Sequence, residues 1–480
     1  MIAATVLGSG MAAIDGTVVG IALPSIGRQF HAPLSTLQWV VTGYTLALAS
    51  LLLLGGSLGD RRGRRRVFNI GVVWFAVASA ACALAPNTDV LIATRVLQGV
   101  GAALLTPGSL AIIQASFDPE DRSRAIGAWS GLGGVATAAG PLLGGYLISV
   151  ASWRWIFVIN IPIGVLVLFS SARHVPESKD PNAGGRVDLP GAAMAVVGLA
   201  GVTFALIEGP ALGWSDPAVL AMLAAGIAGA TAFVFVERRS AAPMLPLAFF
   251  RKRRFTVTNL VTFLVYAALG GLLFLLPVEL QVVDRYTPLE SGVALLPLTV
   301  IMLLLSARSA QLASRIGPRL QMSVGPLVIG AGLALLARST TDSSYVSGVL
   351  PAMVVFGLGL AATVAPLTAT ALSAVADATP ACSSAVNNDV ARVGGLIAVA
   401  VLPALAGISG SSYLHPAELA GGFRSAALIA ASWCVIGGAV SAIGIRNPRP
   451  PQEGPIGEAP SAEPEEVCLH CALDATPLNS

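Results

Sequence analysis

Long uninterrupted runs of apolar residues dominate the chain, and short polar segments separate them. An α-helix that rises about 1.5 Å per residue needs about 20 apolar residues to cross a hydrocarbon core of about 30 Å, and the runs have this length. They do not alternate between polar and apolar positions, which argues against transmembrane β-strands. The pattern predicts fourteen membrane-spanning helices, near residues 2–25, 37–58, 67–86, 90–113, 125–150, 155–171, 189–208, 217–236, 256–280, 290–312, 321–338, 346–372, 385–408 and 424–445.

The composition agrees with this pattern. Of the 480 residues, 55% are hydrophobic and 11% are charged, whereas about 25% of the residues of a soluble domain are charged. A net charge of +3 is too small to indicate a nucleic-acid partner. The sequence therefore predicts an all-α integral membrane protein, with the lipid bilayer as its surroundings and no soluble domain of any size.

The basic residues predict how the chain is inserted, because cytoplasmic segments of membrane proteins carry an excess of Lys and Arg. If the first helix starts in the cytoplasm, 21 basic residues fall in cytoplasmic segments. The opposite face receives only five, which are Arg28, Arg154, Arg285, Arg338 and Arg424. We therefore expect a multi-pass protein of the plasma membrane with both termini in the cytoplasm.

A short motif recurs in the two halves of the chain. The segment Leu58–Arg65 after the second predicted helix returns as Leu312–Arg319 after the tenth, at an offset of 254 residues. Leu23-Pro24 returns as Leu276-Pro277 at an offset of 253. Both halves start from the cytoplasmic side, so they are parallel repeats related by an axis along the membrane normal.

The repeat predicts four regions. Two parallel six-helix bundles occupy residues 1–172 and 255–446, and a substrate site is expected between them at the middle of the membrane. Two additional helices with their linkers are inserted at residues 173–254. Residues 447–480 are rich in Pro, Glu and Ala and have no apolar period, which predicts a disordered cytoplasmic tail.

The loop after the second predicted helix reads Gly56-Ser57-Leu58-Gly59-Asp60-Arg61-Arg62-Gly63-Arg64-Arg65. Glycines permit a tight turn, and the carboxylate can cap a helix N-terminus or pair with arginines. This loop resembles the signature that the major facilitator superfamily carries between helices 2 and 3. Residues 10–446 are similar to its fourteen-helix drug:proton antiporter branch, the multidrug efflux transporters. The resemblance implies a gating loop formed by Gly56, Asp60, Arg61, Gly63 and Arg64, and an Arg-rich loop without this role is the alternative.

The first predicted helix carries one acidic residue, Asp15, among apolar neighbours. A carboxylate at the centre of a membrane helix costs roughly 3 kcal/mol to insert, so we expect it to face the bundle interior or water. The segment Ile14–Pro24 resembles the first-helix signature of the antiporter branch, although Gly20 stands where that branch usually has Asn. We predict that Asp15 binds and releases the coupled proton, and a purely structural role is the alternative.

The fourth predicted helix carries a buried cation in the segment Arg95–Gly101. Arg95, Gln98 and Gly99 share one helix face because three or four residues separate them. A buried Arg needs a counter-charge or carbonyl groups, and Asp15 across the cavity is the candidate. The segment resembles the fourth-helix signature, whose Arg the family implicates in proton transfer. A static ion pair with Asp15 is the alternative.

The fifth predicted helix contains Gly140-Pro141-Leu142-Leu143-Gly144-Gly145. Small residues let helices approach closely, and Pro141 can kink the backbone. The order resembles the fifth-helix antiporter motif, formed here by Gly140, Pro141, Gly144 and Gly145. In this superfamily that motif accompanies exporters and not uptake symporters. The segment Trp153–Pro162 resembles the start of helix 6 in the same branch.

The thirteenth predicted helix contains a second charged group. The segment Asn388–Gly395 resembles the Arg and Gly-Gly element of helix 13, where the family more often has Asn at the position of Asp389. Asp389 and Arg392 lie three residues apart on one face. They either neutralise each other or form a second proton or cation site. Glu208 and Glu279, near predicted outer helix ends, are interpreted as solvated rim charges.

These resemblances predict proton-coupled export of lipophilic, often cationic, drugs by alternating access, with protons and a small molecule as partners. Dedicated export of one antibiotic or secondary metabolite, uptake by symport, and a membrane enzyme or sensor without transport are the alternatives. The sequence has no Gly-x-x-x-x-Gly-Lys-Ser/Thr loop, which argues against an ATP-driven pump. We expect no enzymatic activity, cofactor or metal centre, since Cys468, His470 and Cys471 have no fourth ligand nearby.

Overall fold

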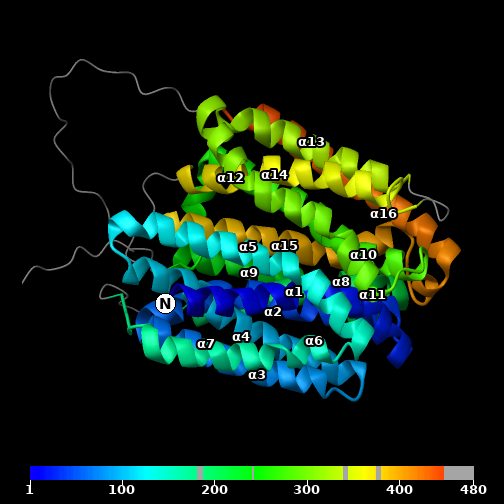
Figure 1. Ribbon diagram of the computed structural model, residues 1–480, viewed down its shortest axis with the longest axis horizontal. Helices are drawn as coiled ribbons and strands as arrows, with labels where there is room; N and C mark the ends of the chain where they lie inside the picture. The colour runs from blue at the N-terminus through cyan, green and yellow to red at the C-terminus, as the bar shows by residue number, and fades with distance from the viewer. Residues whose placement is uncertain (181–187, 241–242, 339–343, 375–379, 448–480) are drawn as a thin grey trace, which may run out of the picture.

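The structure, a computed structural model, describes residues 1–180, 188–240, 243–338, 344–374 and 380–447 (Figure 1). Within these ranges the chain forms helices and no β-strand. The elements are α1 (Ile2–Phe30), α2 (Leu34–Arg62), α3 (Arg64–Ala83), α4 (Thr88–Ser116), α5 (Pro119–Val150), α6 (Trp155–Val158), α7 (Asn160–His174), α8 (Leu189–Leu212), α9 (Pro217–Arg239), η1 (Leu247–Arg251), α10 (Arg253–Val282), α11 (Pro288–Ala294), α12 (Leu296–Ile316), α13 (Pro318–Leu336), α14 (Val349–Ser373), α15 (Pro380–Leu405), η2 (Ser412–Leu414) and α16 (Pro416–Gly444).

Fourteen spans in the described residues are long and apolar enough to cross a membrane. α6 and α7 together form the sixth span, Trp155–His174, and α11 and α12 together form the tenth, Pro288–Ile316. The predicted number and order of spans are confirmed. The predicted limits are too short in places, because α2 continues to Arg62 and α16 already begins at Pro416.

Two groups of helices repeat the same packing order. In the N-terminal bundle (α1–α7), α4 packs between α2 and α3, while α1 packs against α5 and α7. In the C-terminal bundle (α10–α16), α14 packs in the same way between α12 and α13, while α10 packs against α15 and α16. The predicted pair of parallel six-helix bundles is therefore confirmed. Their limits at residues 172 and 255 stay a prediction.

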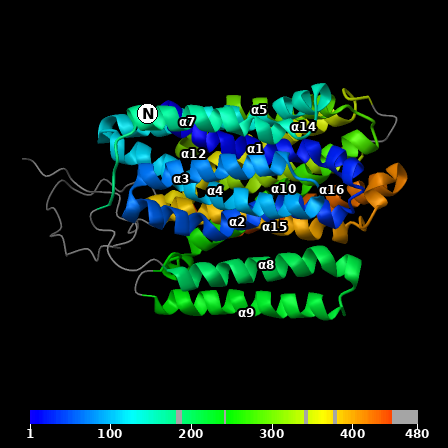
Figure 2. The same ribbon diagram turned by 90° about the horizontal axis from the view of Figure 1, so that it is seen from below.

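The two inserted helices, α8 and α9, form a separate layer beside the bundles (Figure 2). Gly198 and Gly201 of α8 meet Gly226 and Gly229 of α9 so closely that a Cβ at any of the four would collide with the neighbouring helix. Close backbone packing of this kind holds membrane helices together where lipid removes the hydrophobic driving force. α8 also contacts α2 and α15, so the pair touches one helix of each bundle.

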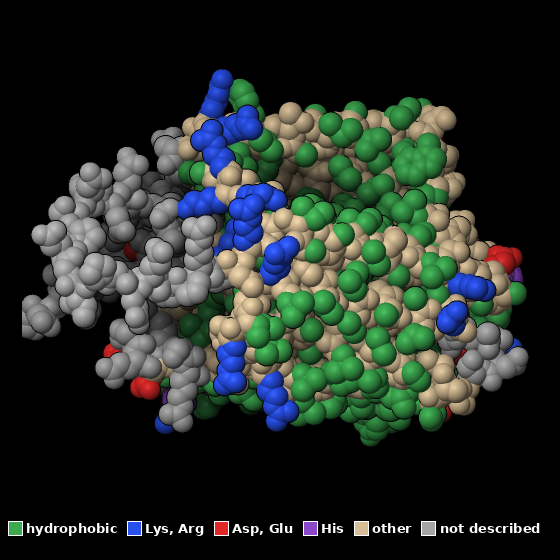
Figure 3. Space-filling model, turned by 90° about the horizontal axis from the view of Figure 1, so that it is seen from above, with side chains coloured by type: hydrophobic (Ala, Val, Ile, Leu, Met, Phe, Trp, Pro, Cys, Tyr) green, Lys and Arg blue, Asp and Glu red, His purple; other side chains and the backbone are tan. Residues whose placement is uncertain are grey.

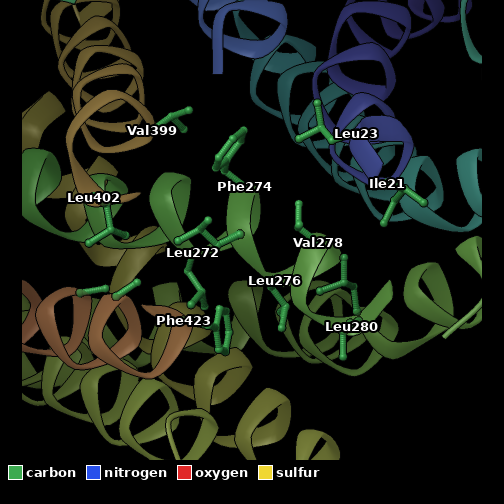
Figure 4. Close-up of a cluster of buried hydrophobic side chains, with 14 of the residues drawn as sticks. Ile21, Leu23, Leu272, Phe274, Leu276, Val278, Leu280, Val399, Leu402 and Phe423 are labelled. Carbon is green, nitrogen blue, oxygen red and sulfur yellow. The ribbon is translucent and has the colours of Figure 1, made fainter. Parts of the chain in front are cut away.

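One apolar core joins the two bundles at one end of the molecule. It combines buried residues of α1 and α2 with residues of α10 to α16. Figure 4 shows side chains of this cluster from α1, α10, α15 and α16, among them Leu23, Leu276, Leu402 and Phe423. A second cluster lies within the N-terminal bundle alone. The bundles are thus sealed against each other at the end where α1 finishes and α2 begins.

Most of the Lys and Arg side chains on the face drawn in Figure 3 gather towards one end of the molecule. The α2–α3 loop, with Arg61, Arg62, Arg64, Arg65 and Arg66, is the richest basic segment. We call the end of the molecule that carries this loop the basic end, and the end sealed by the shared core the far end.

Candidate functional site

Asp15 lies halfway along α1 and is fully buried, with 0% of its surface exposed. Its Oδ2 accepts a hydrogen bond of 2.5 Å from Nη1 of Arg95 in α4, and that side chain is 1% exposed. Asp15 therefore faces the bundle interior and not lipid. It stands where the counter-charge of Arg95 was expected, but the pair lies inside the N-terminal bundle and does not reach across a cavity between the bundles.

Neutral donors complete the surroundings of the carboxylate. Nε2 of Gln98 donates to Asp15 Oδ1 over 2.8 Å, and Nδ2 of Asn160 donates to the same oxygen over 3.1 Å. Both amides also donate to the hydroxyl of Ser79, over 3.2 and 3.0 Å. Each carboxylate oxygen thus has a partner, which a buried charge requires. Asp15 is therefore fully hydrogen-bonded within the N-terminal bundle.

Arg95 connects the pair to other helices. Its Nε donates to the carbonyl of Val40 in α2 over 3.1 Å, and its Nη1 also donates to Gln98 Oε1 over 2.6 Å. The guanidinium carbon lies 4.3 Å from the centre of the Tyr44 ring and 5.7 Å from that of Phe157, both within cation–π range. A change in the charge of Asp15 on α1 therefore alters the interactions that Arg95 makes with α2, α4 and α6.

A cavity of about 230 Å³ lies at the basic end. Its walls come from α2, α4 and α5 of the N-terminal bundle, from the linkers of the inserted pair and from α15 of the C-terminal bundle. Trp129, Met244 and Asn388 mark these three sides. Since the two bundles are in contact at the far end and separated by a cavity at the basic end, the structure is open towards the basic end.

The predicted gating loop is mostly helical. Gly56, Asp60 and Arg61 lie in the last turns of α2, and Arg64 is the first residue of α3. Only Gly63 makes the turn, with a φ of 112° that favours glycine. The tight turn is therefore present but is made by one glycine, and the gating role of these residues stays a prediction. Asp60 accepts a hydrogen bond of 2.8 Å from Arg64 Nε, so it pairs within its own loop, and both side chains line the cavity.

Glu177, a few residues beyond α7, caps the start of α3. Its Oε1 accepts from the backbone N–H of Arg65 over 3.0 Å, and its Oε2 accepts from the N–H of Arg66 over 3.2 Å. A carboxylate at this position satisfies free N–H groups and opposes the positive end of the helix dipole. A Cβ on Gly63 would meet the same carboxylate, so a glycine is needed there for space as well.

The C-terminal bundle repeats this cap with a different residue. Gly317, with a φ of 84°, precedes α13, and Oδ1 of Asn447 accepts from the N–H of Arg319 over 3.1 Å. In both bundles the capping residue follows the last helix of the bundle and holds the start of the third. Residues 448–480 of the predicted tail lie outside the described residues.

The antiporter motif lies where α5 meets α1 and α11. Gly140 and Gly144 leave room for Thr17 and Val18 of α1, where any Cβ would collide. Gly145 faces the backbone of α11, and the carbonyl of Pro141 packs against another glycine of α11. α5 continues as one helix through Pro141. The motif therefore provides close contacts both inside the N-terminal bundle and across to the C-terminal bundle.

Asp389 and Arg392 lie on α15, but no ion pair within 4 Å joins them in the described part of the chain. Asp389 Oδ1 and Arg392 Nε are both buried without a hydrogen-bond partner. Arg392 lies close enough to Tyr44 and Tyr266 to interact electrostatically with both. The two side chains form no direct ion pair here, but Arg392 is close enough to interact electrostatically with Asp389, so mutual neutralisation and a second charge site both stay predictions.

The two glutamates interpreted as solvated rim charges are not simply solvated. Oε1 of Glu208 in α8 accepts a hydrogen bond of 2.8 Å from Trp39 Nε1 in α2. Oε2 of Glu279 in α10 is buried without a partner, beside a cavity of about 580 Å³ that Asp284 also lines. Glu208 thus attaches the inserted pair to the N-terminal bundle, and Glu279 belongs to a separate cavity at the far end.

Sequence reasoning missed several residues of the site. Asn160 binds the carboxylate, and Ser79 accepts from the two amides that bind it. Only Asn160 gave a signal, as an amide in the segment Trp153–Pro162. Glu177 gave none, because a single acidic residue in a linker has many possible partners. In the described residues no group of three His, Cys, Asp or Glu side chains could hold a metal ion, and the Cys468–Cys471 segment lies outside them.

Residues 5–399 match the family model described as Major Facilitator Superfamily. The chain is 36% identical over 414 residues to the multidrug resistance protein Stp of Mycobacterium tuberculosis, an alignment that covers 86% of this chain and 76% of the relative. It is 38% identical over 405 residues to the puromycin resistance protein pur8 of Streptomyces alboniger, with coverages of 84% and 80%. It is 37% identical over 413 residues to the tetracenomycin C resistance and export protein of Streptomyces glaucescens, with coverages of 84% and 74%.

Solved structures share the fold at lower identity. A bacterial homologue of the human lysosomal transporter Spinster superposes with a TM-score of 0.65 at 17% identity, and the match covers 92% of this chain and 96% of that one. The xylose transporter XylE of E. coli superposes with a TM-score of 0.61 at 15% identity, covering 92% and 97%. The family model, the curated relatives and the repeated six-helix bundles agree that this chain belongs to the major facilitator superfamily.

Proposed function

We propose that this protein exports lipophilic, often cationic, drugs across the plasma membrane in exchange for protons, and that it has no enzymatic activity. The relatives named above are described as proteins of multidrug resistance, of puromycin resistance and of tetracenomycin C resistance and export. The observation that carries the coupling is the Asp15–Arg95 pair, a buried carboxylate with a cationic partner 2.5 Å away. Ionisable residues inside membrane bundles mark proton relays and ion pathways.

The orientation that follows from the basic residues gives the cavity a direction. With the basic end in the cytoplasm, as the excess of Lys and Arg favours, the cavity of about 230 Å³ opens inward and both termini are cytoplasmic. The structure then corresponds to the state that takes up drug from the cell. Trp129 and Met244 offer apolar contacts there, and Asp188 offers negative charge to a cation, whereas Asp60 is already paired with Arg64.

The proton step acts through Arg95. In the inward-open state Asp15 is ionised and holds the guanidinium by a direct hydrogen bond. A proton from outside neutralises Asp15 and leaves Arg95 as an uncompensated charge inside the bundle, which is costly. Arg95 then moves with the α2 and α4 backbones that it touches. This movement favours the outward-open state, from which drug leaves. Release of the proton to the cytoplasm restores the pair and the inward-open state.

The stoichiometry decides which gradient drives transport. If one monovalent cation leaves for each proton that enters, no net charge moves and only the pH gradient contributes. That gradient supplies about 1.4 kcal/mol per pH unit, which corresponds to a tenfold concentration ratio. Asp389 of α15, whose Oδ1 is unpaired, is a candidate second charge site that would change this ratio.

Everted membrane vesicles with an imposed pH gradient test the assignment. The probe is a panel of lipophilic cations that includes ethidium and puromycin. Wild-type vesicles accumulate at least one of them, whereas Asp15→Asn vesicles with equal amounts of inserted protein accumulate none. Asp216→Asn is the matched control, because Asp216 caps the start of α9 away from the Asp15 site and Asn caps a helix equally well. Wild-type rates for Asp15→Asn would refute the coupling role.

A dedicated exporter of one antibiotic is the second candidate. It is favoured by the relatives whose names specify one compound, puromycin or tetracenomycin C. A resistance profile confined to one chemical class, measured in a drug-sensitive host that expresses the protein, would support it. Resistance to several unrelated lipophilic cations would exclude it.

A further inference from the structure

Gln38, near the start of α2, reaches from one bundle to the other. Its side chain is 4% exposed, and its Nε2 donates to the carbonyls of Val399 and Ala400 in α15, over 2.7 and 3.1 Å. α2 belongs to the N-terminal bundle and α15 to the C-terminal bundle. These two hydrogen bonds therefore exist only while the bundles are in contact at the far end.

The acceptor is available because of a proline. In an α-helix each carbonyl accepts from the N–H four residues later, and the residue four positions after Val399 is Pro403, which has no N–H. The Val399 carbonyl is thus left free by its own helix at a buried place, where an unsatisfied carbonyl is costly. Gln38 supplies the missing donor from the opposite bundle.

The contact between the Gln38 amide and the Val399 carbonyl is shielded from lipid and from bulk water. α8 covers the line where α2 meets α15, and the crevice between the three helices, lined by Gln38, Ile207 and Ala404, has a volume of about 20 Å³. That is room for about one water molecule. While the far end is closed, no other donor replaces the amide of Gln38 as efficiently, whereas opening of the far end admits water to the Val399 carbonyl.

Other hydrogen bonds also join the two bundles at the far end. Gln281 of α10 donates to the carbonyl of Ile21 in α1 over 2.9 Å, and the hydroxyl of Tyr413 donates to the carbonyl of Ala32 over 2.7 Å. Gln38 differs from these because it makes two bonds and because its main acceptor lies inside a helix that has no N–H to offer it. Removal of the Gln38 amide therefore leaves the Val399 carbonyl without a donor in the closed state.

We propose that Gln38 and the carbonyl freed by Pro403 form a latch that holds the outer end of the transporter closed and sets the balance between its inward-open and outward-open states. The inference rests on the proposed transport by alternating access. Opening outward breaks both hydrogen bonds, so loss of the Gln38 amide shifts the equilibrium towards the outward-open state by roughly tenfold. Gln38 is a positioning residue, and it contacts neither the carboxylate of Asp15 nor the cavity at the basic end.

The experiment measures the separation of the two bundles at the outer end by double electron–electron resonance. Spin labels are placed at Asp89→Cys in the N-terminal bundle and Val346→Cys in the C-terminal bundle, both exposed positions at that end, in protein whose five native cysteines are replaced. The reference protein shows mainly the short distance of the closed end. Gln38→Met, which keeps the size of the side chain without the donor, shifts population to a longer distance.

Two further variants decide the mechanism. Pro403→Ala restores an N–H that competes for the Val399 carbonyl, so it produces a shift in the same direction although Gln38 is intact. Gln29→Ala is the matched control, because Gln29 lies at the same end but bonds Trp153 and Arg154 within its own bundle, and it leaves the distances unchanged. The proposal is overturned if Gln38→Met and Pro403→Ala leave the distances unchanged, or if Gln29→Ala shifts them equally. This readout needs no proton coupling, so it can fail or succeed independently of the role of Asp15.

Discussion

A charge pair inside a bundle of apolar helices is stable only while both partners are present. Asp15 and Arg95 are 0% and 1% exposed, and removal of one partner of such a pair costs about 3–5 kcal/mol because the other charge stays buried. We expect Arg95→Met to lower the melting temperature of the purified protein strongly. The double variant Arg95→Met with Asp15→Leu recovers most of the loss, because no charge remains.

This double-mutant cycle separates the pair from simple packing. Arg95 also contacts Tyr44 and the Val40 carbonyl, and these contacts are lost in both the single and the double variant. If the double variant is no more stable than Arg95→Met, the cost comes from packing and not from the unpaired carboxylate. The measurement is the unfolding midpoint of each variant in the same detergent.

Asp284, in the turn between α10 and α11, predicts a pH dependence of stability. Burial raises the pKa of its carboxyl to about 6, above the ordinary value of about 4. A raised pKa means that the folded protein prefers the protonated form of Asp284. The contribution of the protonated carboxyl to stability is therefore complete below about pH 4 and is lost as the pH rises through 6. We expect Asp284→Asn to raise the melting temperature at pH 7.5 and to leave it unchanged at pH 4. An equal change at both pH values would contradict this.

At the scale of single elements, the start of α3 depends on a residue that lies far away in the sequence. Glu177 accepts from two backbone N–H groups at that start, and loss of a helix cap costs about 0.5–2 kcal/mol. We expect Glu177→Ala to lower the melting temperature by a few degrees and Glu177→Gln, which keeps an acceptor oxygen, to lower it less. Asn447→Ala tests the equivalent cap of α13, and an unchanged melting temperature for both alanine variants would show that these caps do not stabilise the helices.

The sequence predicts the helices well because lipid permits few alternatives. A chain in hydrocarbon must satisfy its backbone as a helix, so apolar length alone gives the number and order of spans. The limits are less predictable. α16 begins at Pro416 and α2 continues to Arg62, since helices extend into polar segments wherever caps and neighbours stabilise them.

The residues of the site are harder to predict than the helices. Asp15 and Arg95 could be found because charges inside membrane helices are costly and few. Ser79 and Glu177 could not, and Asn160 gave only a weak signal, because their roles depend on which helices lie side by side. The helical state of Gly59 and Asp60 was also missed, since a glycine-rich segment fits a turn or a closely packed helix equally well.

At the scale of the whole molecule, the two bundles make different contacts at their two ends. The far end is closed by a shared apolar core and by hydrogen bonds such as those of Gln38 and Gln281. The basic end contains a cavity instead. Two similar bundles that meet at one end can rock about the middle of the membrane, which is the motion that alternating access requires.

The inserted pair, α8 and α9, is connected to both bundles. Glu208 of α8 accepts from Trp39 of the N-terminal bundle, while Phe249 and Phe250 of η1, which follows α9, pack against Phe255 of α10 in the C-terminal bundle. The pair covers the line between α2 and α15 through the contacts of α8. The pair therefore covers the line between the two bundles on this side of the molecule.

The central claim is that a proton and a drug exchange through Asp15. The most direct test is the number of protons released when a cation that the vesicles accumulate is added to purified protein in weakly buffered detergent solution, followed with a pH indicator. The account predicts about one proton per bound cation for the wild type and for Asp216→Asn, and none for Asp15→Asn. Equal proton release by Asp15→Asn, with the cation still bound, would contradict it.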